Sequence, residues 1–231
     1  MRSFDDPIEA ARAALFAHAR ALVGVDLTEL AERLGFAAPA DGAERNRSKG
    51  WVGQIIEREL GVESDGRAGP DFAALGVELK TVPVNERGVP RESTAVCQID
   101  PIAIAGESWE TSTARHKLAC VLFVGVVWPD AEHAVSERRV SSACLWSPTR
   151  EDDRLLRTDF EMFVRSYFRM GLAPAITGHL GRVLQVRPKG KNAADTRDAF
   201  DEHGQPIRVG RMGFYLRPAF VAGILRNEAA S

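Results

Sequence analysis

The sequence predicts a mixed α/β fold, with a central mixed β-sheet flanked by helices in a body of two lobes. Helical patterns and short β-branched or strongly apolar segments alternate along the chain. Its 231 residues, of which 45% are hydrophobic and 27% charged, are enough for one sizeable core. We therefore expect a single folded domain over residues 1–231, divided into lobes of about residues 1–146 and 147–231.

Two scaffold helices are predicted near the N-terminus. Residues 6–24 and 26–36 space their apolar side chains at about 3.6 residues, and Asp26 and Glu29 stand in capping-box register. The small and polar residues of 37–50 predict a linker after them.

A third helix is predicted at residues 51–60, where a glycine follows the last turn. Apolar residues cover one side of its helical wheel. On that wheel Glu59 points into the apolar arc, whereas Glu57 lies outside it. Periodicity therefore marks Glu59 as the unusual acid of this helix.

The strands are predicted from β-branched content and apolar alternation. Residues 77–84 (VELKTVPV) form the first, and residues 93–99 are expected to be its antiparallel partner across a loop. Residues 117–128 (KLACVLFVGVVW) are the most apolar segment and are predicted to be central. The remaining predictions are a strand at 133–146, a long amphipathic helix at 147–171, a strand at 181–190, a turn or short helix at 191–200, a strand at 212–218 and a final helix.

Composition limits the classes of protein. No apolar run approaches the roughly 20 residues that cross a bilayer, so we expect a cytoplasmic protein with no membrane partner. Three cysteines, each in an apolar segment, favour buried thiols over disulfides or a zinc site. The net charge is -2, but residues 182–226 carry nine Lys or Arg against four Asp or Glu. That segment is either a phosphate-binding surface or a solvated basic face.

Asp71, Glu78 and Lys80 form the most informative cluster. Residues two apart in a strand share a face, so the side chains of Glu78 and Lys80 project together. If the loop that carries Asp71 folds back beside the strand, two carboxylates and an ammonium group meet. Such a group suits Mg²⁺, which binds one or two carboxylates and accepts a phosphate oxygen. The chemistry would be metal-assisted phosphodiester hydrolysis, with Lys80 holding or deprotonating the attacking water.

Local spacing alone also fits a simpler interpretation. An acid two residues before a lysine is common in a chain of this composition, and an exposed ion pair on a strand would explain it. Likewise Tyr215, between two apolar residues, fits a half-buried structural position, and His116 fits either a phosphate contact or the end of a loop.

Longer blocks of the sequence carry a family resemblance. In order along residues 47–222 they are SKGWVGQIIERELG, PDFAALGVELKTVPV, WETSTARHKLACVLF, CLWSP, LQVRPKGKNA and GFYLRPAF. Together they closely resemble the MutH family, the strand-discriminating endonucleases of DNA mismatch repair. The resemblance implies a restriction-endonuclease-like fold with a PD-(D/E)xK site. Its N-terminal catalytic lobe and C-terminal DNA-reading lobe would form a DNA cleft.

The same resemblance implies an activity, a cofactor and partners. The enzyme would nick the unmethylated strand of hemimethylated GATC, 5′ to the G, in double-stranded DNA. It would use Mg²⁺, with Mn²⁺ expected to substitute and Ca²⁺ expected to bind without supporting cleavage. It would be stimulated by MutL after MutS finds a mismatch, and we expect it to act as a monomer.

Residue roles follow by position in the matching blocks. Asp71, Glu78 and Lys80 match the catalytic residues of the family, Glu57 matches its additional carboxylate, and Lys117 its second catalytic lysine. The metal ligands implied are Asp71, Glu78 and Glu57, so the family pattern prefers Glu57 where the helical wheel singled out its neighbour. The DNA-binding residues implied are Lys49, His116, Arg187, Pro188, Lys189 and Tyr215.

Physical chemistry agrees with the DNA-binding part of this set. Arg or Lys can pair bidentately with guanine O6 and N7, and Tyr215 near adenine N6 would exclude a methyl group for lack of room. Ala95 departs from the pattern, because an aromatic residue is expected there.

Two alternative functions remain. A type II restriction endonuclease of the same fold would cut both strands at GATC. A non-catalytic DNA-binding module would keep the fold without the reaction, although three carboxylates near a polyanion would then lower its affinity for DNA.

Overall fold

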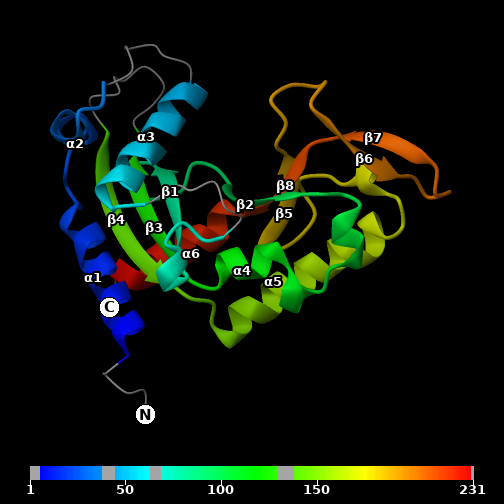
Figure 1. Cartoon of the computed structure of the whole chain (residues 1–231), viewed down its shortest axis with the longest axis horizontal. Coiled ribbons are helices and arrows are strands. Elements are labelled where there is room, and N and C mark those ends of the chain that lie inside the picture. Colours follow the sequence, from blue (N-terminus) through cyan, green and yellow to red (C-terminus); the bar gives the residue numbers. More distant parts are fainter. Residues whose placement is uncertain (1–5, 38–44, 63–68, 129–137, 230–231) are drawn as a thin grey trace. The chain divides into compact units, whose positions relative to one another are not determined.

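The computed structural model describes residues 6–37, 45–62, 69–128 and 138–229, apart from the side chains of residues 45–49 and 227–229. The chain forms two compact units, each built from separated segments (Figure 1). The first unit comprises Met1–Glu92, Cys120–Ser147 and Val221–Ser231; the second comprises Ser93–Ala119 and Pro148–Phe220. The predicted division after residue 146 lies beside one of the four points at which the chain passes between units.

A small mixed sheet is the centre of the first unit. Strand β1 (Glu78–Val84) pairs in parallel with β3 (Val121–Val127), and β3 pairs antiparallel with β4 (Arg139–Trp146). Every residue of β3 is buried, so the segment predicted to be central does occupy the middle of its sheet. The strand is shorter than predicted, because residues 117 and 118 belong to a helix of the second unit.

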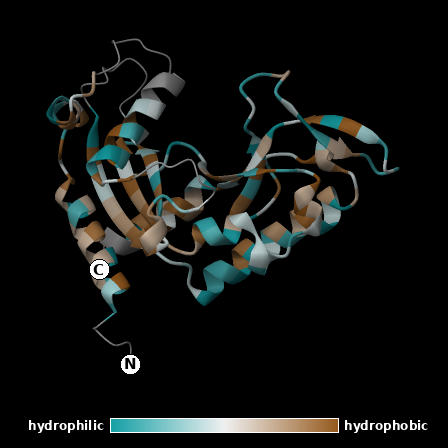
Figure 2. Cartoon of the chain, viewed as in Figure 1, coloured by the Kyte–Doolittle hydropathy of each residue, from teal (hydrophilic) through white to brown (hydrophobic). Residues whose placement is uncertain are grey.

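Helices cover this sheet. Helix α1 packs against β4, and α3 packs against β1. The core between them includes Leu27, Ile55, Leu122 and Val124, and Figure 2 shows hydrophobic residues along β3 and β4. The helices of the unit are α1 (Pro7–Ala21), α2 (Leu27–Leu34), α3 (Arg45–Glu59), the 3₁₀ turn η1 (Ala73–Leu75) and, from Val221 onward, α6 (Pro218–Ala229).

The predicted helix ends follow local chemistry. The Asp26 carboxylate accepts hydrogen bonds from the amides of Thr28 and Glu29, which caps α2. Helix α3 begins at Arg45, so the linker predicted for residues 37–50 is too long at its C-terminal end. Its residues 38–44 lie outside the described part of the chain.

The second unit contains an antiparallel sheet and a hairpin. Strand β8 (Met212–Leu216) lies between β2 (Thr94–Ile99) and β5 (Leu184–Pro188), and β6 (Thr196–Phe200) pairs with β7 (Pro206–Gly210). The helical segments of the unit are η2 (Ala103–Gly106), η3 (Trp109–Thr111), α4 (Thr113–Leu118), α5 (Arg150–Phe163), its π-helical extension η5 (Val164–Phe168) and η6 (Ala173–Ala175).

Aromatic packing joins α5 to this sheet. The ring of Phe214 on β8 lies 5.5 Å from that of Phe160 and 6.1 Å from that of Phe163, measured between centroids. The ring of Trp109 also packs on that of Phe160, with 5.5 Å between the centroids. These contacts fix one face of β8 against α5, so the opposite face is the one that can carry polar side chains.

One predicted strand pairing and one predicted element are wrong. Residues 93–99 do not pair with 77–84 but with β8 in the other unit. Pro83 and Pro90 both lack an amide donor, so residues 83–85 and 89–91 pair only briefly. Their contacts are the Val84–Pro90 bridge and two hydrogen bonds, from the Arg91 amide to the Pro83 carbonyl and from the Asn85 amide to the Val89 carbonyl. Residues 191–200 were predicted as a turn or short helix, but their second half is β6, which the turn at 201–205 folds onto β7.

The mixed α/β class is confirmed, although the strands are divided among three small sheets. None of the helices within the described ranges is long and apolar enough to span a bilayer.

Candidate active site

The loop that carries Asp71 folds back onto the first residues of β1. Phe72 and Val77 form an isolated antiparallel bridge, and Gly76 closes the turn between them at φ 62°, a left-handed conformation that glycine adopts without strain. The Asp71 carboxylate then accepts a hydrogen bond from the Leu79 amide at 2.8 Å. The condition set by the sequence is therefore met: Asp71 lies beside the strand that carries Glu78 and Lys80.

Glu78 and Lys80 form a close ion pair. Lys80 Nζ donates to Glu78 Oε1 at 2.6 Å, and only 2% of the Glu78 surface is exposed. An exposed surface pair, which was the simpler interpretation of this spacing, does not describe a glutamate buried to this extent. A buried carboxylate needs a compensating positive charge, and Lys80 supplies one.

Glu57 on α3 belongs to the same group of charges. Partial burial raises the pKa of Glu57, the negative charge of Asp71 raises it further, and the positive charge of Lys80 opposes both. Electrostatic interactions thus link Glu57 to Asp71 and Lys80, and Lys80 is paired with Glu78, all within the first unit.

Glu59, the acid that the helical wheel singled out, has a structural role. Its Oε1 accepts a hydrogen bond from Arg33 at 2.8 Å and lies 3.2 Å from the His18 ring nitrogen. Glu59 thereby links α3 to α1 and α2, so its place on the apolar side of the helix is explained by polar partners.

The donors of this cluster fit Mg²⁺. Among the residues that the structure describes, no group of three or more His, Cys, Asp or Glu side chains is arranged to hold a metal ion. Mg²⁺ does not require one, since it binds through one or two carboxylates and keeps several waters. Asp71 accepts a hydrogen bond from the Leu79 amide, next to Glu78. Burial and the charge of Asp71 raise the pKa of Glu57, and a nearby cation would favour its ionised form.

The other implied residues come from other elements. His116 and Lys117 occupy the last turn of α4, which is assigned to the second unit. Ser112 caps that short helix by accepting from the Arg115 amide. Lys49 lies within α3, but its side chain is outside the described part of the structure.

One face of the second unit's sheet carries two of the implied DNA-binding residues, Arg187 and Tyr215. Tyr215 on β8 is opposite both Ala95 on β2 and Gln185 on β5, so these three share a face. Arg187 lies two residues beyond Gln185, on the same face, and its side chain is exposed. We call this surface, defined by Ser93, Ala95, Gln185, Arg187, Gly213 and Tyr215, the polar face of the sheet.

Lys189 crosses the polar face beside Tyr215. Its ammonium group lies 5.8 Å from the centroid of the Tyr215 ring. Gly213 makes this path possible, because a Cβ there would lie 3.0 Å from the Lys189 side chain and 2.6 Å from the Cys97 carbonyl. The sheet therefore places the Lys189 ammonium group and the Tyr215 phenol side by side.

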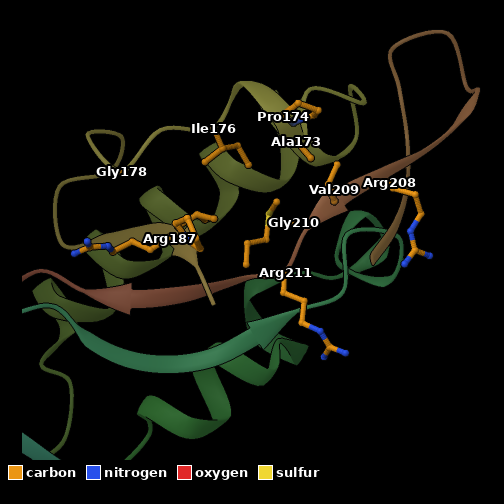
Figure 3. A pocket seen from close by; sticks show the side chains of 12 residues that line it. Ala173, Pro174, Ile176, Gly178, Arg187, Arg208, Val209, Gly210 and Arg211 are labelled. Carbon is orange, nitrogen blue, oxygen red and sulfur yellow. The ribbon is translucent and has the colours of Figure 1, made fainter. Parts of the chain in front are cut away.

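A pocket of about 350 Å³ lies beside the last residues of β5 and the first residue of β8. Figure 3 shows that the Arg187 side chain extends away from Ala173 and Pro174, which lie at the opposite end of the pocket. The Arg208 and Arg211 side chains also point away from them. The guanidinium of Arg187 is thus directed out of the pocket.

Asp159 was not predicted from the sequence, although it determines where β5 begins. This buried carboxylate on α5, 3% exposed, accepts hydrogen bonds from the amides of Arg182, Val183 and Leu184 at 2.7–2.9 Å. Its position three residues after the buried Leu156, on the core side of the helix, was the available signal.

The fold and the site together define a class: a nuclease of the restriction-endonuclease-like type, with Glu78 and Lys80 on a sheet strand and Asp71 in the loop before it. A family model described as DNA mismatch repair enzyme MutH matches residues 60–159. Proteins named DNA mismatch repair protein MutH from Haemophilus ducreyi, Yersinia enterocolitica and Salmonella paratyphi B are 42%, 42% and 44% identical, over 93%, 93% and 95% of this chain and 93%, 92% and 93% of theirs. The chain belongs to the MutH family of DNA mismatch repair endonucleases.

Proposed function

We propose that this member of the family is a Mg²⁺-dependent endonuclease that nicks the unmethylated strand of hemimethylated GATC, 5′ to the G, during mismatch repair. The observation that carries the proposal is the hydrogen bond from the Leu79 amide to Asp71, since it holds Asp71 next to Glu78 and Lys80. The family matches over nearly the whole chain support a role in DNA mismatch repair.

The proposed division of labour follows from the residues. Asp71 and Glu78, with Glu57, would hold the metal ion. When bound, Mg²⁺ supplies positive charge that stabilises the negative charge growing on phosphorus and makes water more acidic. Lys80, held by Glu78 on the edge of the cluster, would orient the attacking water beside the phosphate. We further propose that Lys117 on α4 is the second catalytic lysine and that His116 beside it contacts DNA.

Recognition is assigned to the second unit. Arg187 and Lys189 would contact the guanine edge, with Pro188 between them, and Tyr215 would sense the methyl group of adenine. A misplaced methyl group would cost on the order of 1–3 kcal/mol, as a mismatched base pair does. Lys49 would contact the DNA backbone.

We propose MutL as the direct partner that stimulates nicking, and MutS as an indirect one that signals a mismatch. Mn²⁺ would replace Mg²⁺ in the reaction, whereas Ca²⁺ would support DNA binding without cleavage. The protein would act as a monomer on its site.

A plasmid assay tests this function. Supercoiled plasmids with hemimethylated, unmethylated or fully methylated GATC sites are incubated with the protein and Mg²⁺, with and without MutL. We expect nicked circles from hemimethylated DNA, faster nicking with MutL, and resistance of fully methylated DNA. Rapid linearisation of unmethylated plasmid without MutL would instead identify a restriction enzyme, and binding with no cleavage under any condition would identify a non-catalytic module.

A further inference from the structure

A buried hydroxyl group lies next to Arg187. Ser93 Oγ accepts a hydrogen bond from Gln185 Nε2 at 2.5 Å and another from Arg187 Nη1 at 3.0 Å. Ser93 is 7% exposed and Gln185 is 3% exposed, so both are buried although both are polar. The two donors are two residues apart on β5 and so share the polar face of the sheet.

These contacts span the sheet. Ser93 immediately precedes β2, whereas Gln185 and Arg187 lie on β5, with β8 between the two strands. A serine at one edge therefore holds a guanidinium group at the opposite edge. An apolar pair would fill the same space without the cost of desolvating an amide and a hydroxyl group, so stability alone does not favour this arrangement.

We propose that Ser93 and Gln185 are positioning residues that orient the Arg187 guanidinium for guanine recognition. The proposal rests on the function proposed above, in which Arg187 contacts the guanine of GATC. Gln185 fixes the hydroxyl group of Ser93, and the hydroxyl group fixes one terminal nitrogen of Arg187. A guanidinium group has five N–H donors in a rigid plane, so holding one nitrogen sets the direction of the donors that remain.

Orientation matters here because the side chain is exposed. A free arginine on the surface samples many rotamers, and ordering it when DNA binds costs free energy. A side chain that is already oriented avoids this cost only for the base whose acceptors match its direction. Ser93 would therefore act on the choice of sequence more than on general affinity for DNA.

A base analogue makes this testable in the full-length protein. Dissociation constants are measured by fluorescence anisotropy in Ca²⁺ for duplexes containing GATC and for the same duplexes with 7-deazaguanine at that G, which lacks the N7 acceptor. We expect wild type to bind the analogue roughly tenfold more weakly, as for the loss of part of a bidentate contact. In Ser93→Ala we expect this ratio to fall to about twofold or less.

Matched variants separate positioning from folding. Ser93→Thr keeps the hydroxyl group and should restore the wild-type ratio. Thr94→Val removes a neighbouring buried hydroxyl group on the opposite face of β2 and should leave the ratio unchanged. If Ser93→Ala does not fold, Gln185→Met, which keeps the length of the side chain, takes its place and should lower the ratio in the same direction.

The two possible failures differ. If wild type binds both duplexes equally, guanine recognition itself, and with it the proposed function of Arg187, is wrong. If wild type discriminates and Ser93→Ala or its substitute discriminates just as strongly, the positioning role is wrong while the proposed function stands.

Discussion

Asp71 combines two tasks in one side chain. Its carboxylate holds the loop against β1 through the Leu79 amide, and its negative charge acts on Glu57. A substitution that keeps the hydrogen bond but removes the charge separates these tasks.

We therefore predict that Asp71→Asn folds normally but loses activity. The amide oxygen of Asn can still accept from the Leu79 amide, whereas the metal site loses a negative ligand. We expect nicking in Mg²⁺ to fall by about two orders of magnitude or more, since metal charge contributes several kcal/mol to such reactions. Affinity for GATC duplexes in Ca²⁺ should stay within about threefold, a change of less than 1 kcal/mol. Normal nicking by this variant would show that the site is assigned wrongly.

The raised pKa of Glu57 gives a prediction for the metal-free protein. Because the folded pKa lies above the unfolded value, the protonated form favours folding, and this contribution is lost as the pH rises through the folded pKa. In EDTA, Glu57→Gln should therefore melt at a higher temperature than wild type at neutral pH. The difference should shrink as the pH falls toward 4.5, the ordinary value for glutamate.

Glu59→Gln is the matched control on the same helix. It weakens the contacts to Arg33 and His18. The free energy of unfolding should therefore fall by no more than about 1 kcal/mol, and the melting temperature should fall slightly. Equal effects of the two substitutions would contradict the assignment of different roles to Glu57 and Glu59.

At the level of elements, β5 depends on α5 for its starting point. Asp159 satisfies three consecutive backbone amides that would otherwise be buried without acceptors. We predict that Asp159→Ala lowers the free energy of unfolding by roughly 3 kcal/mol, measured by urea denaturation. Glu161→Ala, which removes only partly exposed ion pairs from the same helix, should cost about 1 kcal/mol or less.

The sequence predicts elements well where one local pattern dominates. The central position of β3 follows from its uninterrupted apolar run, and the cap of α2 from Asp26. Strand pairing was predicted wrongly for β2, because two prolines stop the pairing with β1 and the partner strand, β8, lies more than a hundred residues away. No local pattern carries that information.

The residues of the candidate site also divide into those that a local sequence pattern groups and those that it does not. Glu78 and Lys80 could be grouped from the two-residue period of a strand, but the return of Asp71 depends on a turn at Gly76. Glu57 was chosen over Glu59 only by family resemblance, since the partners of Glu59 lie on other helices. Ser93 gave no signal, because its partners come from a strand about ninety residues later.

At the level of the whole molecule, charge is unevenly distributed between the units. The second unit has 15 Lys or Arg and 12 Asp or Glu, a balance of +3, which leaves -5 for the first unit within the total of -2. The weakly acidic balance of the whole chain, -2, thus conceals a positively charged unit suited to phosphates and a negatively charged unit suited to cations.

We predict that binding to duplex DNA weakens as NaCl is raised, and that basic residues outside the polar face contribute to this dependence. Lys191→Ala and Arg197→Ala, both exposed, should each reduce the slope of log affinity against log salt by about 0.9 if they contact a phosphate. Preference for GATC over other sequences, measured by anisotropy in Ca²⁺, should not change. A change in that preference would place these residues at the bases instead.

The last point at which the chain passes between the units affects the order in which the two units are completed during synthesis. The second unit ends at Phe220, whereas the first still requires Val221, Ile224 and Leu225, which are buried in it. During synthesis, which proceeds from the N-terminus, the second unit is therefore complete before the first unit is. A chain interrupted near its end keeps every strand of the second unit but lacks buried residues that the first unit needs.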